Sequence, residues 1–289
     1  MEPTDLIKKV RHIEIKARGL SRNIFAGEYH SAFKGRGMAF SEVREYRYGD
    51  DMRDIDWNVT ARYNRPYIKI FEEERELTVM LMIDVSGSLG FGSRSVLKRD
   101  MVVEIAATLA FSAIQNNDKI GVIFFTDKVE KFIPPQKGRK HILFIIREIL
   151  GFTPESSGTD LNMALRYMTN AIKKRCTAFL ISDFIDPNDY QKALQIANRK
   201  HDLVAIQVYD VLSTALQPIG LMKVRDPETG GERWINTSSK QVREQYRSWW
   251  NTLQEKKLTA FRQSGVDNIS VSTESDYVKS LLQLFQQRR

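Results

Sequence analysis

The stretch LTVMLMIDVSGSLGFGS, residues 77–93, decides the fold because an apolar run ends abruptly in an acid and two hydroxyls. Residues 77–83 are apolar or β-branched throughout, which favours a strand covered on both faces within a parallel sheet. Asp84, Ser86 and Ser88 follow at alternate positions, in a loop whose glycines allow the three side chains to converge. Carboxylate and hydroxyl oxygens are hard ligands, which suit Mg²⁺, Mn²⁺ or Ca²⁺. The stretch therefore predicts a buried strand that leads into a metal-binding loop.

Apolar strands and helices alternate along the residues that follow. We expect helices over 95–116, 139–150 and 188–200 and one that runs to 174, strands over 120–125, 177–181 and 203–209, and an edge strand over 128–133. This alternation is typical of an open, mainly parallel α/β sheet with helices on both faces. Right-handed crossovers place the carboxyl ends of the strands at one edge, where ligands bind at the switch point in strand order. Asp183 follows the strand over 177–181 and Thr159 precedes a helix, so both are expected at the same edge as Asp84.

The flanking segments are less regular. Residues 1–24 predict an amphipathic helix that packs on the body of the protein, and 25–76 predict a small module of short strands and turns. We therefore expect two parts, 1–76 and 77–289, with a hairpin excursion near 221–237 in the second. Alternating Arg and acidic residues over 40–62 favour salt bridges within the module over phosphate binding. Trp57 and Tyr46 are interpreted as core residues rather than as exposed anchors for a partner.

Composition and charge exclude several classes of protein. The net charge of +8 is spread over the whole chain and forms no dedicated basic arm, which argues against a nucleic-acid partner. No apolar segment approaches the roughly 20 residues that a transmembrane helix needs. The one cysteine, Cys176, is expected to be buried and fits a reducing compartment, so we expect a cytoplasmic protein. The sequence does not indicate an oligomeric state.

The five polar positions resemble a known constellation. Asp84-x-Ser86-x-Ser88, followed by Thr159 in a Gly-Thr-Asp loop and by Asp183 at a strand end, resembles the metal-ion-dependent adhesion site of von Willebrand factor A domains. Other motifs resemble the bacterial family known as domain of unknown function 58: Gly35-Arg36-Gly37, Arg44-Glu45-Tyr46, Gly49-Asp50-Asp51, Asp56-Trp57 and Asp226-Pro227-Glu228-Thr229-Gly230. Together these similarities extend over almost the whole chain.

The resemblance implies a fold and a function. The fold is a Rossmann-like von Willebrand factor A sheet with Mg²⁺, or Mn²⁺ or Ca²⁺, held at its top by Asp84, Ser86, Ser88, Thr159 and Asp183. The metal would accept one further oxygen, from a carboxylate of a protein partner. The resemblance also implies that the partner is a MoxR-type AAA+ ATPase or its client, with this protein as an adaptor or co-chaperone rather than an enzyme.

Other interpretations of the same residues stay open. Ser and Asp after a strand often do no more than cap the next helix, and Asp160 is expected to be such a cap. The main alternative function is a metal-dependent phosphoryl-transfer enzyme that uses Asp84. In haloacid-dehalogenase phosphatases a second Asp follows the nucleophile by two residues, and here that position is Ser86. The four histidines are scattered without the context of a catalytic triad, and neither a P-loop nor a dinucleotide-binding motif is present.

Overall fold

The strand expected over residues 77–83 is β3, Thr78–Asp84, and it lies at the centre of a six-stranded sheet. The computed structural model describes residues 3–21, 29, 38–73, 77–90, 97–228 and 230–288. The strand order is β10-β7-β6-β3-β4-β5, and the pairs are parallel except that β5 runs antiparallel to β4 at the edge. The remaining strands of this sheet are β4 Lys119–Phe125, β5 Val129–Gln136, β6 Thr177–Ser182, β7 Asp202–Tyr209 and β10 Asp267–Ser272.

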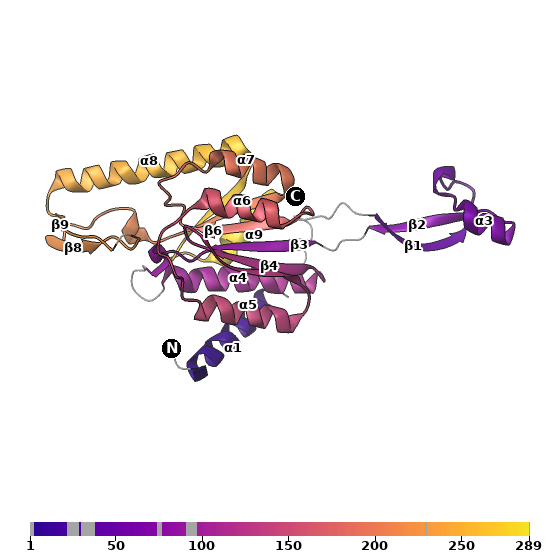
Figure 1. Cartoon of the computed structure of the whole chain (residues 1–289), viewed down its shortest axis with the longest axis horizontal. Helices are drawn as coiled ribbons and strands as arrows, with labels where there is room; N and C mark the ends of the chain where they lie inside the picture. Colours follow the sequence, from indigo (N-terminus) through magenta and orange to yellow (C-terminus); the bar gives the residue numbers. More distant parts are fainter. Residues whose placement is uncertain are drawn as a thin grey trace. The chain divides into compact units, whose positions relative to one another are not determined.

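Helices cover both faces of this sheet (Figure 1). Val79 and Leu81 of β3 contribute to a core shared with α4, α5 and α9, whereas Met80 and Met82 contribute to a core shared with α6, α7 and α8. Successive side chains of a strand point to opposite faces, so a strand buried on both faces must be apolar throughout. The predicted α/β fold class is confirmed. The helix bounds are α4 Lys98–Gln115, α5 Arg139–Gly151, α6 Leu161–Ala171, α7 Gln191–Lys200, α8 Lys240–Ser264 and α9 Tyr277–Gln287.

The strand order reverses between β3 and β6, which are neighbours in the sheet. From β3 the chain moves outward to β4 and β5, and it then returns to the other side of β3 as β6. The helices that follow β3 and β6 therefore diverge to opposite faces, which opens a crevice at the carboxyl ends of these two strands. Asp84 and Asp183 lie at those two ends.

The N-terminal helix α1, Pro3–Leu20, packs against α4 and α5, as expected for an amphipathic helix. Its Ile13 and Ala17 are buried in the same core as β3. The chain accordingly divides into one compact unit of residues 1–33 and 77–289 and a second unit of residues 34–76. In this division residues 1–33 belong to the main unit and not, as expected, with the small module, because the apolar face of α1 is covered by the main unit.

The small unit contains a two-stranded antiparallel sheet of β1 and β2 together with η2 and α3. Arg44 binds Asp50 through two hydrogen bonds of 2.8 Å, which agrees with the expected salt bridges within the module. The core interpretation of Trp57 is wrong, because its side chain is 69% exposed and α3 has no buried residue. A unit of two strands and one short helix encloses too little volume to bury a tryptophan. The bounds are β1 Met38–Glu45, η2 Met52–Asp54, α3 Trp57–Tyr63 and β2 Tyr67–Glu73.

A hairpin leaves the main unit between β7 and α8, within the range expected near 221–237. It consists of β8, Leu221–Arg225, and β9, Glu232–Asn236, which pair antiparallel with each other. The short helix η4, Val211–Ser213, precedes it.

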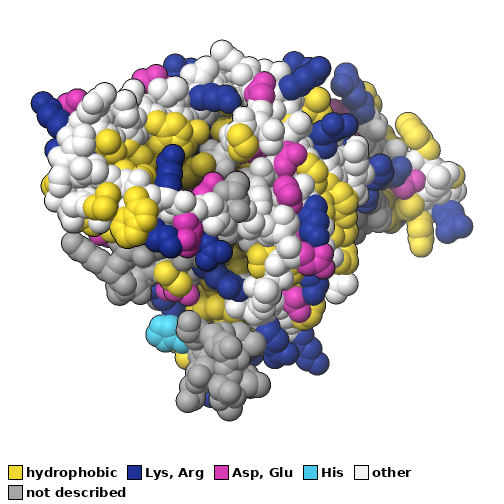
Figure 2. Space-filling model, turned by 60° about the vertical axis from the view of Figure 1, so that its left-hand side comes forward, with side chains coloured by type: hydrophobic (Ala, Val, Ile, Leu, Met, Phe, Trp, Pro, Cys, Tyr) yellow, Lys and Arg dark blue, Asp and Glu magenta, His cyan; other side chains and the backbone are white. Residues whose placement is uncertain are grey.

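On the face of the molecule seen in Figure 2, Lys and Arg side chains are interspersed with Asp and Glu and form no large patch of one charge. Within the described residues, no helix is both long and apolar enough to cross a membrane.

Candidate metal centre

The first acid of the site is Asp84, the last residue of β3, and it is fully buried. Its Oδ1 accepts a hydrogen bond of 2.9 Å from the Ser86 amide, and its Oδ2 accepts one of 2.6 Å from the Ser182 hydroxyl. Burial, followed by the charge of Asp183, raises the pKa of Asp84 to about 7 although these hydrogen bonds lower it. The two hydrogen bonds therefore fix the orientation of the carboxylate. A cation nearby would stabilise its charged form, which burial and Asp183 disfavour.

Ser86 lies between β3 and the short helix η3, Gly87–Gly90, and Ser88 lies within η3. Both are buried, and their hydroxyl oxygens are 3.1 Å apart. Gly87 between them donates its amide to the Ser157 carbonyl at 2.9 Å, which ties η3 to the loop before α6. The turn thus brings the hydroxyls of Ser86 and Ser88 close together.

The second acid is Asp183, which follows β6 and is 1% exposed. Its Oδ1 accepts from the Ile185 amide at 3.1 Å, and its Oδ2 lies 2.8 Å from the ammonium of Lys98. Lys98, the first residue of α4, is itself buried. Because Asp183 raises the pKa of Asp84, the two carboxylates share one electrostatic environment. The crevice at the switch point thus contains two acids and an ammonium group.

Thr159 approaches from the loop before α6 and is 5% exposed. Its hydroxyl donates a hydrogen bond of 2.9 Å to Oε1 of Glu228, in the turn of the β8–β9 hairpin. Asp160, the next residue, caps α6 by accepting from the Met163 amide at 2.8 Å, as expected for this residue. Thr159 and Asp160 are adjacent but have different roles: Thr159 lies at the candidate site, whereas Asp160 caps the amino terminus of α6.

Glu228 brings a third carboxylate to this group. Burial, and then the charges of Asp183, Asp226 and Asp186, raise its pKa, whereas the hydrogen bond from Thr159 lowers it. Asp183 therefore acts electrostatically on both Asp84 and Glu228, which connects the carboxylates of β3, β6 and the hairpin. All five residues selected from the sequence belong to this one cluster.

Sequence reasoning missed four contributors to the cluster, namely Ser182, Lys98, Ser157 and Glu228. Glu228 belongs to the acid-proline-acid turn of the hairpin, which had no assigned role. Lys98 begins the run Lys-Arg-Asp, which is typical of a solvated helix end, and nothing local indicates that it is buried. Glu228 contacts Thr159, which is 69 residues away in sequence, and Lys98 contacts Asp183, which is 85 residues away.

The residues present fit a hard divalent cation by their donor chemistry. Two carboxylates supply charge, and the hydroxyls of Ser86, Ser88 and Thr159 supply neutral oxygens. In the part of the chain that the structure describes, no three His, Cys, Asp or Glu side chains are grouped as ligands, so such a site would depend on these hydroxyls. The Lys98 ammonium already neutralises one of the two acids. The metal ligand set stays a prediction.

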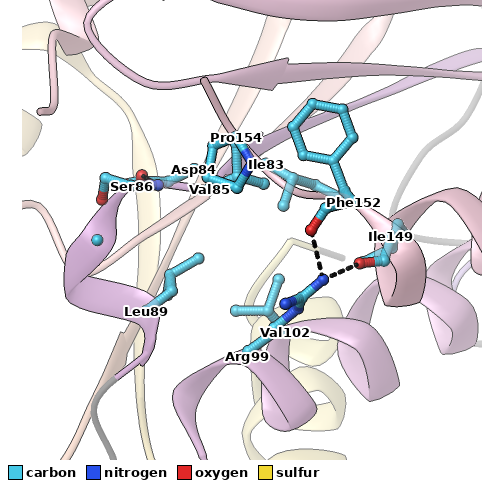
Figure 3. A pocket seen from close by; sticks show the side chains of 11 residues that line it. Ile83, Asp84, Val85, Ser86, Leu89, Arg99, Val102, Ile149, Phe152 and Pro154 are labelled. Carbon is cyan, nitrogen blue, oxygen red and sulfur yellow. Dashed lines mark hydrogen bonds between the residues drawn. The ribbon is translucent and has the colours of Figure 1, made fainter. Parts of the chain in front are cut away.

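A cavity of about 210 Å³ lies beside η3 (Figure 3). Asp84 and Ser86 line one end, and apolar side chains such as Leu89 and Val102 line most of the remainder. The guanidinium of Arg99 donates to the carbonyls of Ile149 and Phe152, at 3.3 and 2.7 Å, near the carboxyl end of α5. Arg99 thus satisfies carbonyls at a helix end, which is a structural role.

Comparisons with known proteins agree with this fold. An uncharacterized protein of Mycobacterium tuberculosis is 26% identical over 286 residues, which cover 98% of this chain and 90% of that protein. The crystal structure of an aerotolerance-related membrane protein from Bacteroides fragilis superposes with a TM-score of 0.51 at 14% identity, over 73% of this chain and 98% of the other. This similarity shows a shared fold.

Another solved structure, proximal thread matrix protein 1 from the mussel byssus with a zinc-occupied metal-ion-dependent adhesion motif, has a TM-score of 0.43 at 14% identity, over 74% of this chain and 48% of the other. A likeness of this extent carries no argument about the chemistry of the present site. The family model described as protein of unknown function DUF58 matches residues 42–256, which include every residue of the cluster. The chain belongs to the DUF58 family.

Proposed function

We propose that this protein is a non-enzymatic interaction module that holds a divalent cation, Mg²⁺ by preference, at Asp84, Ser86, Ser88, Thr159 and Asp183. One observation carries the proposal: five buried oxygen-bearing side chains from β3, η3, β6 and the loop before α6 gather at the switch point of the sheet. Carboxylate and hydroxyl oxygens are the donors that a hard divalent cation binds, and this cluster supplies two acids and three hydroxyls together. When bound, the metal supplies a Lewis-acidic position for one further oxygen.

The chain's own residues prepare that position. Ser86 and Ser182 orient the two oxygens of Asp84 by hydrogen bonds, which restricts the rotation of its carboxylate. Two acids and three neutral hydroxyls leave a divalent ion able to attract one more anionic oxygen. A carboxylate of an Asp or Glu on a protein partner is the group that fits this requirement.

The identity of the partner is a further part of the proposal. We infer a MoxR-type AAA+ ATPase or one of its clients, with this protein as an adaptor or co-chaperone in the cytoplasm. Support for this step comes from the resemblance of the chain's motifs to its family and not from the site, since a fold hosts many functions. A complex that forms in Mg²⁺ and dissociates in EDTA is the expected behaviour.

Calorimetric titration with Mg²⁺ and Mn²⁺ tests the metal site. Wild type should bind one equivalent, Asp84→Ala should bind none, and Glu255→Gln, which removes an exposed carboxylate of α8, should bind as wild type does. The same three proteins should then be mixed with the MoxR-type ATPase of the source organism in Mg²⁺ and in EDTA. Absence of divalent-ion binding by wild type would overturn the proposal.

A phosphatase assay tests the enzymatic alternative. With p-nitrophenyl phosphate and Mg²⁺, wild type and Asp84→Ala should both show no turnover above background. Both oxygens of Asp84 accept hydrogen bonds, and the residue two positions later is Ser86, whose hydroxyl lies near that of Ser88. Turnover by wild type that Asp84→Ala abolishes would favour phosphoryl transfer instead.

A further inference from the structure

The turn of the β8–β9 hairpin lies on the candidate metal centre, although its Glu228 is 69 residues from Thr159 in sequence. The Glu228 side chain accepts a hydrogen bond of 2.9 Å from Thr159, and its backbone carbonyl accepts one of 2.6 Å from the Ser157 hydroxyl. Both donors belong to the loop before α6. One residue of the hairpin is thus held at two points by the loop that carries a predicted metal ligand.

Gly87 shows how closely the turn approaches the site. A Cβ atom at this position would lie 2.3 Å from the carbonyl oxygen of Pro227 and 3.4 Å from Cβ of Ser157. Real Cβ atoms do not come so close to a backbone oxygen, so any other residue at position 87 would force the turn to move. The central glycine of the Ser86-Gly87-Ser88 loop therefore provides the space in which the hairpin turn fits.

The rest of the hairpin is weakly held. No residue of β8 or β9 is buried, and each strand pairs with the other. At its base, the buried Thr237 donates its hydroxyl to the Gly220 carbonyl at 2.7 Å and accepts from the Ile219 amide at 3.1 Å. A two-stranded hairpin alone is marginally stable in water, so its docked position depends on contacts at its base and at its turn, where Glu228 and Pro227 approach the site. None of the described residues of 221–236 belongs to either apolar core of the sheet, so those cores do not depend on the docked position of the turn.

Glu228 carries a carboxylate, which is the same chemical group that the site is proposed to recognise on a partner. Glu228 presents a carboxylate to Thr159, a predicted ligand, beside Asp183. A partner's Asp or Glu would need the same hydroxyl and the same surroundings. Two carboxylates cannot occupy one such position at the same time, because they would need the same space and the same hydrogen bond from Thr159.

We propose that Glu228 is a built-in carboxylate occupant of the site, and that an acidic segment of a partner must displace the β8–β9 hairpin in order to bind. This inference rests on the proposed function, whose regulation it describes. The free energy that holds the hairpin on the site lowers the apparent affinity for the partner, since only the undocked fraction can bind.

Binding of an acidic peptide tests the proposal. Wild type, Glu228→Gln and the surface control Glu255→Gln are titrated with fluorescein-labelled hexaglutamate in Mg²⁺, with EDTA and with hexaglutamine as controls, and anisotropy is measured. Glu228→Gln should bind the peptide at least about tenfold more tightly, within the range usual for coupled sites. Gly87→Ala, which removes the space for Pro227 without changing charge, should also raise the affinity.

Hydrogen exchange gives a readout that is independent of binding. Without metal, amides of residues 221–236 should exchange faster in Glu228→Gln than in wild type. In Mg²⁺, addition of the peptide should accelerate the exchange of the same amides in wild type. Equal peptide affinity of Glu228→Gln and Glu255→Gln, with Mn²⁺ binding intact in both, would overturn the hairpin proposal alone. Failure of wild type to bind Mn²⁺ would instead overturn the proposed function.

Discussion

The ammonium of Lys98 lies 2.8 Å from Oδ2 of Asp183, and both side chains are almost completely buried. An amino group thus supplies the positive charge that a metal would bring to the same carboxylate. Breaking a buried ion pair by removing one partner is costly because the other charge stays desolvated. The pair therefore allows the protein to fold before a divalent cation arrives.

Replacement of Lys98 by Met should make stability depend on the metal. In EDTA, the free energy of unfolding should fall by about 3 to 5 kcal/mol because Asp183 loses its counter-ion. In saturating Mg²⁺ most of this loss should be recovered, since the cation replaces the ammonium. Urea denaturation with and without Mg²⁺ measures both values.

Lys257→Met is the matched control, because Lys257 is equally buried but binds Gln207 and Gln254 instead of an acid. Its loss of stability should be the same in EDTA and in Mg²⁺. If Lys98→Met were no more sensitive to Mg²⁺ than Lys257→Met, the ammonium and the metal would not compete for Asp183.

Replacement of Asp84 by Asn should separate stability from binding. Asp183 and burial both disfavour the charged form of Asp84, which favours the amide, but the amide nitrogen can no longer accept one of the two hydrogen bonds from Ser86 and Ser182. These effects oppose each other, so the stability of the metal-free protein should stay within about 1 kcal/mol of wild type. The rise in Tm that wild type shows in Mg²⁺ should disappear. Thermal denaturation with and without Mg²⁺ checks this, and a marked destabilisation in EDTA would show that the charge of Asp84 is needed for folding.

Arg99 should be important for stability and not for metal binding. Its guanidinium donates to the carbonyls of Ile149 and Phe152 (Figure 3) and to that of Leu150, near the carboxyl end of α5. Arg99→Met should lower the free energy of unfolding by about 1 to 3 kcal/mol. Calorimetry should find Mg²⁺ affinity unchanged, and a large loss of affinity would place Arg99 in the site.

His201 should make the fold sensitive to acid. It is fully buried with Nδ1 3.3 Å from the Cys176 sulfur, and burial, followed by the charges of Lys200 and Arg175, lowers its pKa to about 4. The unfolded chain takes up this proton near pH 6.5, so the unfolded state binds more protons between these values. The contribution of His201 to the free energy of unfolding should therefore decrease as pH falls from about 6.5 towards 4, by up to about 3 kcal/mol. Asp84, whose pKa is raised to about 7, contributes in the opposite direction as it takes up a proton, so the decrease is measured against a variant that lacks His201.

Urea denaturation at pH 7.5 and pH 5.0 measures this decrease. From pH 7.5 to pH 5.0, the free energy of unfolding of His201→Gln should fall less, or rise more, than that of wild type, whereas His12→Gln, which alters an exposed residue of α1, should behave as wild type does. An unchanged difference in His201→Gln would assign the acid sensitivity to other groups.

Local patterns were sufficient for much of the fold. The apolar run of β3 predicted a doubly covered strand because side chains that face two layers of helices must all be apolar. Asp160 was expected to cap α6, and it does so through a contact only three residues away. Trp57 was misinterpreted because composition shows that a residue is apolar but not whether its unit is large enough to bury it.

By itself, the sequence determined where the polar positions stand relative to the strands. Parallel strands joined by right-handed crossovers must place their carboxyl ends at one edge, so Asp84, Thr159 and Asp183 were bound to meet there. Only the tertiary structure decided which other groups meet them. Lys98 and Glu228 come from elements whose local sequence reads as solvated surface, and they reach the site through packing over 85 and 69 residues. Their burial results from how α4 and the hairpin lie against the sheet edge, a property that no local pattern of residues specifies.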